Sequence, residues 1–320
     1  MSGAKPVALV IGASRGIGRQ IAVDLARNSY AVVVSAKTTS DAFSSSTHFP
    51  PNPNSSQSTI STVEREIKED GGEATAVAVD ARDFASVEEL VRKTIEIYGR
   101  LDVLIYNAGA IWWASVEDTP MRRFQLMQRV NPEGLYAAVQ AALPHLKKST
   151  DGGRIVVVSP PIYSRFFRGK TAYAMGKVGM SVLTKGLAMD LERQGLVRHG
   201  QGGMAVTSIW PAVAVESAAT EQFVRRDPGG ARDLRKPTIF SDAVRAILKA
   251  PAPTVNGQLL LDEDFLREHC GITDFSKYCA VPGSKPRRIM PAKLPDLTVE
   301  EQDDEGSRHD SAKARRDSKL

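Results

Sequence analysis

Residues 7–18 read VALVIGASRGIG and decide the fold, because a strand-length apolar run passes directly into a glycine-rich turn. Ile17, Ile21 and Leu25 then recur at four-residue spacing, the pattern of a helix with one apolar face. Small residues in such a turn let an anionic group approach the backbone at the helix N-terminus, where free N–H groups favour negative charge. The spacing is G-x-x-x-G-x-G, and an ordinary strand-to-helix turn is the alternative interpretation.

Similar strand-length runs, many rich in β-branched residues, recur along the chain and alternate with segments of helical period, such as Val63 with Ile67 and Val87 with Val91. This alternation is typical of repeated βαβ units around a parallel sheet. We therefore expect an α/β fold, a Rossmann-type doubly wound parallel sheet of seven strands flanked by helices, within one domain over residues 1–284. The expected strands are residues 7–11, 31–35, 75–79, 103–106, 155–158, 205–209 and 258–261.

Composition narrows the function classes. The 320 residues carry 42 basic and 37 acidic side chains and 42% apolar residues, which argues against a disordered chain. No run approaches the roughly 18 apolar residues of a membrane span, and we expect none. The net charge of +5 is too diffuse to indicate nucleic acid, and two cysteines give neither a disulfide framework nor a metal site. A small-molecule substrate is the expected partner.

Two segments fall outside the alternating pattern. Residues 38–59 are rich in Ser, Pro and Asn and predict a flexible surface insertion. Residues 285–320 predict a disordered charged tail that ends in Ser-Lys-Leu. A C-terminal S-K-L is a receptor-read peroxisomal address, so we expect a peroxisomal location and an import receptor as partner; chance occurrence is the alternative.

A glycine turn of this kind can hold the pyrophosphate of a nicotinamide dinucleotide. The charge beside the adenosine ribose then distinguishes NAD(H), with a free 2′-hydroxyl, from NADP(H), with a 2′-phosphate. The second expected strand ends Ser35-Ala36-Lys37 without a carboxylate, and Arg15 lies inside the glycine turn. Both cations indicate NADP(H), although Lys37 alone is equally consistent with a solvated loop lysine.

Two weaker signals follow the third and fourth expected strands. Asp80 is placed to hydrogen-bond an adenine amino group, but it fits a helix N-cap equally well. Asn107-Ala108-Gly109 is a small polar turn that lets the backbone approach a cofactor, and an ordinary turn is its alternative.

Tyr173 has a lysine four residues further on, Lys177, and no other tyrosine of the chain has this spacing. Residues i and i+4 share a helix face, so we expect the ammonium to lower the pKa of the phenol from its usual value of about 10. Such a phenol is a proton donor for a carbonyl. A surface helix is the alternative for the pair by itself.

Taken in order, these motifs resemble those of the short-chain dehydrogenase/reductase family over residues 5–265. The matching stretches are GASRGIG at the glycine turn, NAG at residues 107–109, Asn131 within RVNPEG, and YAMGK from Tyr173. The stretches AKT (residues 36–38), SPP (159–161), WP (210–211) and DEDFLREHCGITDF (262–275) resemble those of a hydroxysteroid dehydrogenase-like group. Known members of that group carry a C-terminal sterol-carrier domain, which we do not expect within these 320 residues.

The resemblance implies a role for each matching position. Tyr173 would be the general acid or base, Lys177 would hold the nicotinamide ribose, and Asn131, at a helix irregularity, would relay protons. The implied cofactor-binding set, besides Tyr173 and Lys177, is Gly12, Ser14, Arg15, Gly16, Ile17, Gly18, Lys37, Asp80, Asn107, Gly109, Val215 and Ser217. No metal is implied, and family members often form homo-oligomers.

One departure concerns the catalytic serine, which in this family usually precedes the tyrosine by 13 positions. Pro160 stands there, and Ser159 takes the role only if the following loop is one residue longer. We expect an NADP-dependent oxidoreductase that acts on a carbonyl or secondary alcohol of a lipid-derived substrate, with Trp112, Trp113, Phe166 and Phe167 either lining its pocket or packing in the core. An enoyl- or dienoyl-CoA reductase and a catalytically weak NADP-binding sensor or scaffold are the alternatives.

Overall fold

The computed structural model describes residues 5–40, 49–200 and 202–299. Its core is a seven-stranded sheet in the order β3-β2-β1-β4-β5-β6-β7, and every pairing in it is parallel. The predicted fold class is therefore confirmed, and each predicted strand is present within two residues of its expected ends. The strands are β1 (Val7–Ile11), β2 (Ala31–Ala36), β3 (Glu73–Ala78), β4 (Val103–Tyr106), β5 (Arg154–Val158), β6 (Ala205–Trp210) and β7 (Leu259–Leu261).

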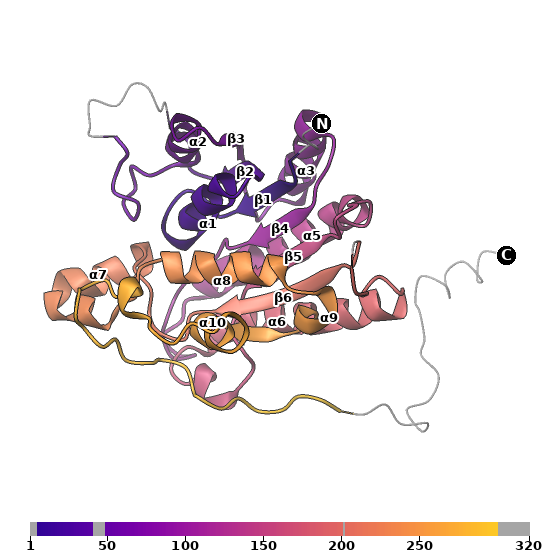
Figure 1. The fold of residues 1–320 in the computed structure, drawn as a ribbon. Helices are drawn as coiled ribbons and strands as arrows, with labels where there is room; N and C mark the ends of the chain where they lie inside the picture. The colour runs from indigo at the N-terminus through magenta and orange to yellow at the C-terminus, as the bar shows by residue number, and fades with distance from the viewer. Residues whose placement is uncertain (1–4, 41–48, 201, 300–320) are drawn as a thin grey trace.

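Helices cover both faces of the sheet (Figure 1). The first layer contains α1 (Gly16–Arg27), α2 (Ile60–Glu69) and α8 (Thr238–Lys249), and the second contains α3 (Phe84–Tyr98), α5 (Gly134–Leu146) and α6 (Thr171–Arg193). The other helical segments are α4 (Met121–Gln128), η1 (Arg129–Glu133), η2 (Ser164–Phe167), α7 (Ala218–Arg226), η3 (Pro228–Asp233), α9 (Ala252–Val255), α10 (Asp262–Cys270) and η4 (Ser276–Tyr278).

The two layers follow from the two-residue period of a strand. In β1, Ala8 and Val10 pack into the layer of α1 and α8, whereas Leu9 and Ile11 pack into the layer of α3 and α5. All five residues of β1 are buried, as expected of a parallel strand covered on both faces. This explains why β1 is a continuous apolar run.

Strand order reverses next to β1, because β2 lies on one side of it and β4 on the other. In open α/β sheets, ligands bind outside the carboxyl ends of the strands at such a point. The turns that follow Ile11 and Tyr106 meet there, and the site described below is built around them.

The predicted flexible insertion, residues 38–59, is wrong for its last part. Ser58 and Thr59 are buried, and Thr59 caps α2 in a reciprocal pair of hydrogen bonds with Thr62. The backbone carbonyl of Pro53 accepts a hydrogen bond from the Gly16 N–H. The segment has no apolar periodicity, because it packs on the glycine turn through polar contacts: the Pro53 carbonyl and the Ser58 hydroxyl both bond to the turn's backbone. Residues 41–48 lie outside the described residues.

The predicted tail also starts too early. Ile289 and Met290 donate backbone hydrogen bonds to the Ala212 carbonyl, and Met290 is buried. Arg288 forms an ion pair with Asp264 of α10. These contacts hold the start of the predicted tail against the loop after β6 and against α10, so the packed chain continues past residue 284. The remainder, residues 300–320 with the S-K-L motif, lies outside the described residues.

Within the described ranges, no helix combines the length and apolarity needed to cross a bilayer. In the same ranges, no three His, Cys, Asp or Glu side chains gather as metal ligands. Cys270 is exposed, Cys279 is buried, and both are free thiols.

Candidate functional site

The glycine turn after β1 touches the turn after β4. A Cβ atom on Gly12 would lie 2.5 Å from the Ala108 nitrogen, and one on Gly18 would lie 2.1 Å from the Gly12 carbonyl oxygen. Gly12 also has φ of +92°, which few other residues adopt. The amide of Asn107 donates to the Gly12 carbonyl at 2.8 Å. Asn107 therefore braces the turn, and its expected contact with cofactor remains a prediction.

The N-terminus of α1 is suited to an anion. Arg15 is its N-cap and makes no capping hydrogen bond with its side chain. Helix geometry leaves the N–H groups of Ile17 and Gly18 without partners in the helix, while the Gly16 N–H is satisfied by Pro53. Ser14 is buried beside them. Because side chains are excluded here and N–H groups point outward, these residues fit a dinucleotide pyrophosphate.

Lys37 and Asp80, predicted to contact different parts of the cofactor, face each other. Lys37 Nζ lies 3.3 Å from an Asp80 carboxylate oxygen, and Arg82 forms a two-point ion pair with the same group. The hydrogen bonds from Arg82, with a smaller contribution from Lys37, hold the pKa of Asp80 well below its usual range. Asp83, rather than Asp80, caps α3. In the described residues Arg15 has no carboxylate partner.

Tyr173 and Lys177 lie on α6 and are each 3% exposed. The Lys177 ammonium donates to the Val158 carbonyl at 2.8 Å and lies 5.5 Å from the Trp210 ring. Burial lowers the pKa of Lys177 to about 7, and burial raises the pKa of Tyr173 above its usual value. The expectation that Lys177 lowers the pKa of the phenol is therefore not met in this structure, because burial outweighs any effect of the neighbouring ammonium.

Asn131 stands in η1, a π-helical turn that includes Pro132. The helix irregularity expected at this position is present. The fully buried Asn131 amide accepts from the Ala110 N–H at 2.8 Å and donates to the Ala110 carbonyl at 3.1 Å. A Cβ on Gly109 would lie 3.4 Å from Lys177 Nζ and 3.5 Å from Asn131 Oδ1. The fold thus brings together Asn131, Gly109 and Lys177.

Ser159 is fully buried at the end of β5. Its hydroxyl lies 2.7 Å from that of Ser208 on β6 and 3.0 Å from that of Ser181 on α6. Ser181 also donates to the Pro160 carbonyl. These contacts hold the Ser159 hydroxyl between two strands and a helix. Its predicted role in polarising the substrate carbonyl remains a prediction.

Aromatic rings surround Tyr173. The Trp113 ring meets it edge-on at 6.2 Å between centroids, and the Phe166 ring lies at 6.3 Å. Phe223 of α7 stacks on Trp113 at 5.7 Å, and we call Trp113, Phe166 and Phe223 the aromatic wall. Trp112 and Phe167 pack beside this cluster. Sequence reasoning missed Phe223, because nothing in the spacing of α7 indicates which loop it meets.

Val215 and Ser217 follow β6. Val215 is buried and bridges to Arg235, and Ser217 caps α7 through Thr220. Ser217 also lies against the glycine turn, since a Cβ on Gly16 would come within 3.6 Å of the Ser217 Cβ. Ser217 therefore lies at the glycine turn, and the expected contacts of Val215 and Ser217 with the cofactor remain predictions.

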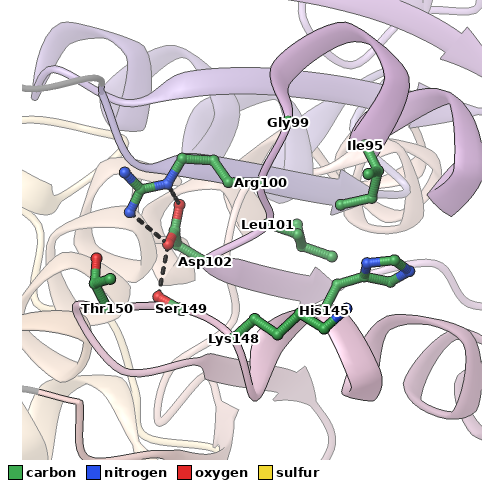
Figure 2. Close-up of a pocket in the computed structure, with 9 residues that line it drawn as sticks. All are labelled: Ile95, Gly99, Arg100, Leu101, Asp102, His145, Lys148, Ser149 and Thr150. Atoms are coloured by element: carbon green, nitrogen blue, oxygen red, sulfur yellow. Dashed lines mark hydrogen bonds and ion pairs between the residues drawn. The ribbon is translucent and has the colours of Figure 1, made fainter.

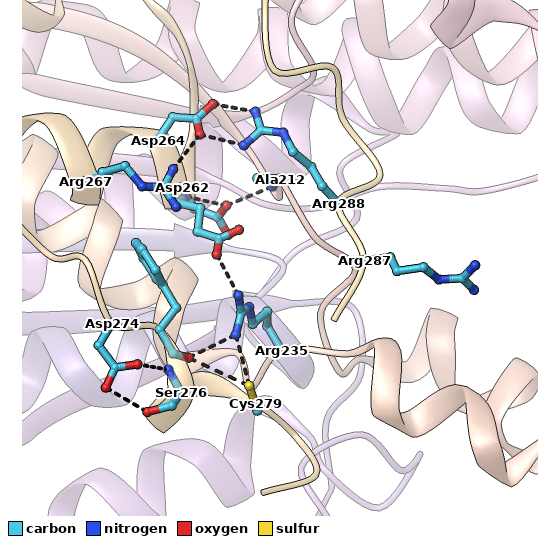
Figure 3. Close-up of polar contacts among 12 residues, drawn as sticks. Ala212, Arg235, Asp262, Asp264, Arg267, Asp274, Ser276, Cys279, Arg287 and Arg288 are labelled. Carbon is cyan, nitrogen blue, oxygen red and sulfur yellow. Dashed lines mark hydrogen bonds and ion pairs between the residues drawn. The ribbon is translucent and has the colours of Figure 1, made fainter. Parts of the chain in front are cut away.

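The loop before Val215 is held at Ala212 by α10 (Figure 3) and by the C-terminal segment. The fully buried Asp262 carboxylate accepts the Ala212 N–H at 2.8 Å, and burial raises its pKa to about 7. Arg235 donates to Glu263 at 2.6 Å and to the Cys279 sulfur at 3.1 Å. The sequence does not predict these contacts between distant segments. The three acidic residues in the first turn of α10 are the only related signal in the sequence of that helix.

A pocket lies at the amino ends of β4 and β5, opposite the carboxyl ends where the glycine turn lies (Figure 2). Asp102 there accepts hydrogen bonds from Arg100, Ser149 and the Val7 N–H. Burial alone would raise the pKa of Asp102, but these donors outweigh it and hold the pKa below its usual value. Because these donors all bind the Asp102 carboxylate, we assign the Asp102 cluster to stability.

The comparisons with known proteins agree with this geometry. A family model described as short chain dehydrogenase matches residues 53–221. Hydroxysteroid dehydrogenase-like protein 2 of Danio rerio is 33% identical over 94% of this chain and 65% of its own length, and the Homo sapiens protein is 35% identical over 86% and 60%. The chain therefore spans less than two thirds of these curated relatives.

Solved structures give the same result. A proposed dehydrogenase from Xanthomonas campestris is 33% identical, with a TM-score of 0.75 over 94% of this chain and 100% of that one. A short chain dehydrogenase from Mycobacterium thermoresistibile is 34% identical, with a TM-score of 0.75 over 89% and 94%. The family match, the parallel sheet and the Tyr173–Lys177 site together place the chain in the short-chain dehydrogenase/reductase family of oxidoreductases, which bind a nicotinamide cofactor.

Proposed function

We propose that the protein is an NADP(H)-dependent reductase or dehydrogenase acting on a carbonyl or secondary alcohol of a lipid-derived substrate. The observation that carries this proposal is the buried pair Tyr173 and Lys177, one turn apart on α6, with Lys177 beside Asn131 and Gly109. A buried phenol that meets a substrate oxygen can transfer a proton without competition from bulk water.

The roles of the side chains follow from their surroundings. When bound, the nicotinamide supplies or accepts the hydride. Tyr173 donates a proton to the substrate oxygen in reduction and removes it in oxidation. Lys177, anchored by the Val158 carbonyl, orients the cofactor ribose and becomes a stronger proton donor as its pKa falls toward 7. Asn131 fixes the turn at Ala110 through two hydrogen bonds to its backbone.

The preference for NADP(H) rests on charge. β2 ends at Ala36 and is followed by Lys37 rather than a carboxylate, and Arg15, the N-cap of α1, has no acidic partner among the described residues. Two cations favour a 2′-phosphate over a free hydroxyl. The Lys37 side chain is 69% exposed and can exchange the Asp80 carboxylate for that phosphate, while Asp80 keeps its ion pair with Arg82.

The substrate class rests on the aromatic wall, whose rings suit an apolar carbon chain near the reacting carbonyl. The peroxisomal location rests on Ser318-Lys319-Leu320 alone. A fluorescent-protein fusion at the N-terminus of the chain, with and without those three residues, tests it. Diffuse fluorescence from both fusions would contradict the peroxisomal assignment.

A second candidate, a weak catalyst that senses or scaffolds through NADP(H), is favoured by one observation. The Ser159 hydroxyl is engaged by Ser208 and Ser181, and Pro160 has no hydroxyl to offer in its place. In that case the protein would bind cofactor normally and turn over carbonyl substrates slowly or not at all.

Turnover by a Tyr173→Phe variant separates the two candidates. For the enzyme, ketone reduction should fall at least 100-fold while NADPH binding, followed by nicotinamide fluorescence, changes less than threefold. Tyr136→Phe, on an exposed face of α5, is the matched control. Absence of ketone and enoyl turnover in the wild type, with intact NADPH binding, would favour the sensor; enoyl turnover alone would indicate a carbon–carbon double-bond reductase.

A further inference from the structure

Lys170 is a cation placed among the rings that surround Tyr173. It is the N-cap residue of α6, three positions before the tyrosine, and its ammonium lies 4.1 Å from the centre of the Phe166 ring and 6.0 Å from that of Trp113. Both rings also contact Tyr173. Lys170 is therefore positioned beside the reacting centre rather than on a remote surface.

The Lys170 ammonium has no acidic partner. No carboxylate or hydrogen-bond acceptor contacts Lys170 Nζ in the described parts of the chain, so three N–H donors remain available. The side chain is half-buried, and burial lowers its pKa below the usual value. A half-buried ammonium stabilised only by ring faces gains more from a negative ligand than a solvated surface lysine does.

The surrounding loop has the same sign of charge. Residues 164–170 read SRFFRGK, with three cations and no acid. Neither Arg165 nor Arg168 has an acidic partner among residues that the structure describes. In the same cluster, Arg123 lies 4.6 Å over the Trp112 ring, and the buried Trp112 indole N–H has no acceptor among the described residues. Positive charge thus lies against several rings of this cluster.

We propose that Lys170 selects substrates that carry an anionic group on the same chain as the reacting carbonyl. Apolar carbons would contact the aromatic wall, the carbonyl would meet Tyr173, and the anion would bind the Lys170 ammonium. This inference rests on the proposed carbonyl chemistry and narrows its substrate class. The anion can be the carboxylate of an oxo acid or the phosphates of a thioester carrier such as coenzyme A, which offer the same charge.

Substrates matched in chain length provide the test. An oxo acid is compared with its methyl ester, and the coenzyme A thioester of the acid with its uncharged N-acetylcysteamine thioester. We expect the wild type to prefer a charged member by at least tenfold in kcat/KM, since hydrogen bonds to charged groups correspond to about 10- to 100-fold. Lys170→Met should abolish that preference through KM, and Lys170→Glu should reverse it. If Lys170→Met removes the preference within the acid and ester pair, the anion is the substrate carboxylate. If it removes the preference within the thioester pair, the anion is a coenzyme A phosphate.

Arg168→Met is the matched control, because Arg168 is exposed in the same loop and contacts no ring of the wall. It should leave the preference within twofold of wild type. If the esters are reduced as well as the acids, and Lys170→Met changes neither, this inference is wrong while the proposed reductase stands. If no substrate is turned over, the proposed function itself is contradicted.

Binding can be read without turnover. The chain has three tryptophans, Trp112, Trp113 and Trp210, and each lies in or beside the Tyr173 cluster. Titration of tryptophan fluorescence with decanoate and with decanol, at saturating NADP⁺, should show at least tenfold tighter binding of decanoate, lost in Lys170→Met. Equal affinities for the two probes in wild type and variant would overturn the inference even for a protein without catalysis.

Discussion

The hydroxyl of Ser159 lies 2.7 Å from the hydroxyl of Ser208 on the adjacent strand. Ser208 in turn donates to the Ser159 carbonyl at 2.6 Å, so the two residues are bound to each other twice. A serine that polarises a substrate carbonyl must direct its hydroxyl into the cleft. Ser159 is fully buried, and its hydrogen bonds are those of a residue that ties two strands together.

Ser159→Ala should therefore change stability more than catalysis. We expect kcat/KM to stay within about threefold of wild type and the free energy of unfolding to fall by about 1 kcal/mol, the usual loss for one buried hydrogen bond. Ser181→Ala, which removes another member of the same network, should behave alike. Steady-state kinetics and urea denaturation measure both effects. A 100-fold loss of kcat at unchanged stability would instead assign Ser159 to the reaction.

Cofactor choice should depend on Arg15 and Lys37. Replacing both by glutamine removes the cations available to a 2′-phosphate, while the glycine turn that holds the pyrophosphate is unchanged. We expect the Kd for NADPH to rise about 10- to 100-fold, as for the loss of one or two charge-assisted hydrogen bonds, and that for NADH to change less than threefold. Nicotinamide fluorescence measures both. Lys249→Gln, at an exposed position on α8, is the control, and equal losses for the two cofactors would contradict the assignment.

The fold could be predicted from the sequence because its strands are covered on both sides. Burial on two faces forces runs such as residues 7–11 and 103–106 to be apolar throughout, and such runs stand out without an alignment. The glycine turn was equally legible, since Gly12 and Gly18 are the positions where a Cβ would strike backbone. Both signals are local in the chain.

What could not be predicted depends on contacts between distant segments. Ser159 meets Ser208 across 49 positions, and Phe223 reaches Trp113 from a helix with no buried residue. The raised pKa of Tyr173 is a consequence of burial, which a four-residue spacing does not reveal. For the same reason the sequence does not reveal the packing of residues 49–59 and 285–290, since polar segments that pack through backbone atoms leave no apolar period.

The described end of the insertion should support cofactor binding. The buried Ser58 hydroxyl donates to the Ser14 carbonyl at 2.7 Å, directly within the glycine turn. We expect Ser58→Ala to weaken NADPH and NADH binding alike by several-fold and to lower the free energy of unfolding by about 1–2 kcal/mol, because a buried acceptor loses its donor. Ser56→Ala, exposed in the same segment, is the matched control. Unchanged binding of both cofactors would show that the turn holds its shape without this segment.

Asp262 should make stability fall as pH rises toward neutrality. Its carboxyl has a pKa of about 7 when folded against 3.8 for the ordinary group, so between these values the native state holds a proton that the unfolded state has lost. The stability that comes from keeping Asp262 protonated in the native state is fully present at low pH. It is lost as the pH rises from the pKa of Asp262 in the unfolded state to its pKa in the folded state. Asn at this position keeps an acceptor for the Ala212 N–H but does not titrate.

The free energy of unfolding of Asp262→Asn minus that of wild type should therefore increase by about 2–3 kcal/mol between pH 5 and pH 7, given about 1.4 kcal/mol for each unit of pH. Urea denaturation at several pH values measures it. Asp274→Asn is the matched control, because hydrogen bonds from Ser276 lower the pKa of Asp274 and it is already ionised throughout that window. A difference that stays constant from pH 5 to pH 7 would mean that Asp262 is ionised in the native protein, and that the loop after β6 is held by a charge rather than by a neutral acid.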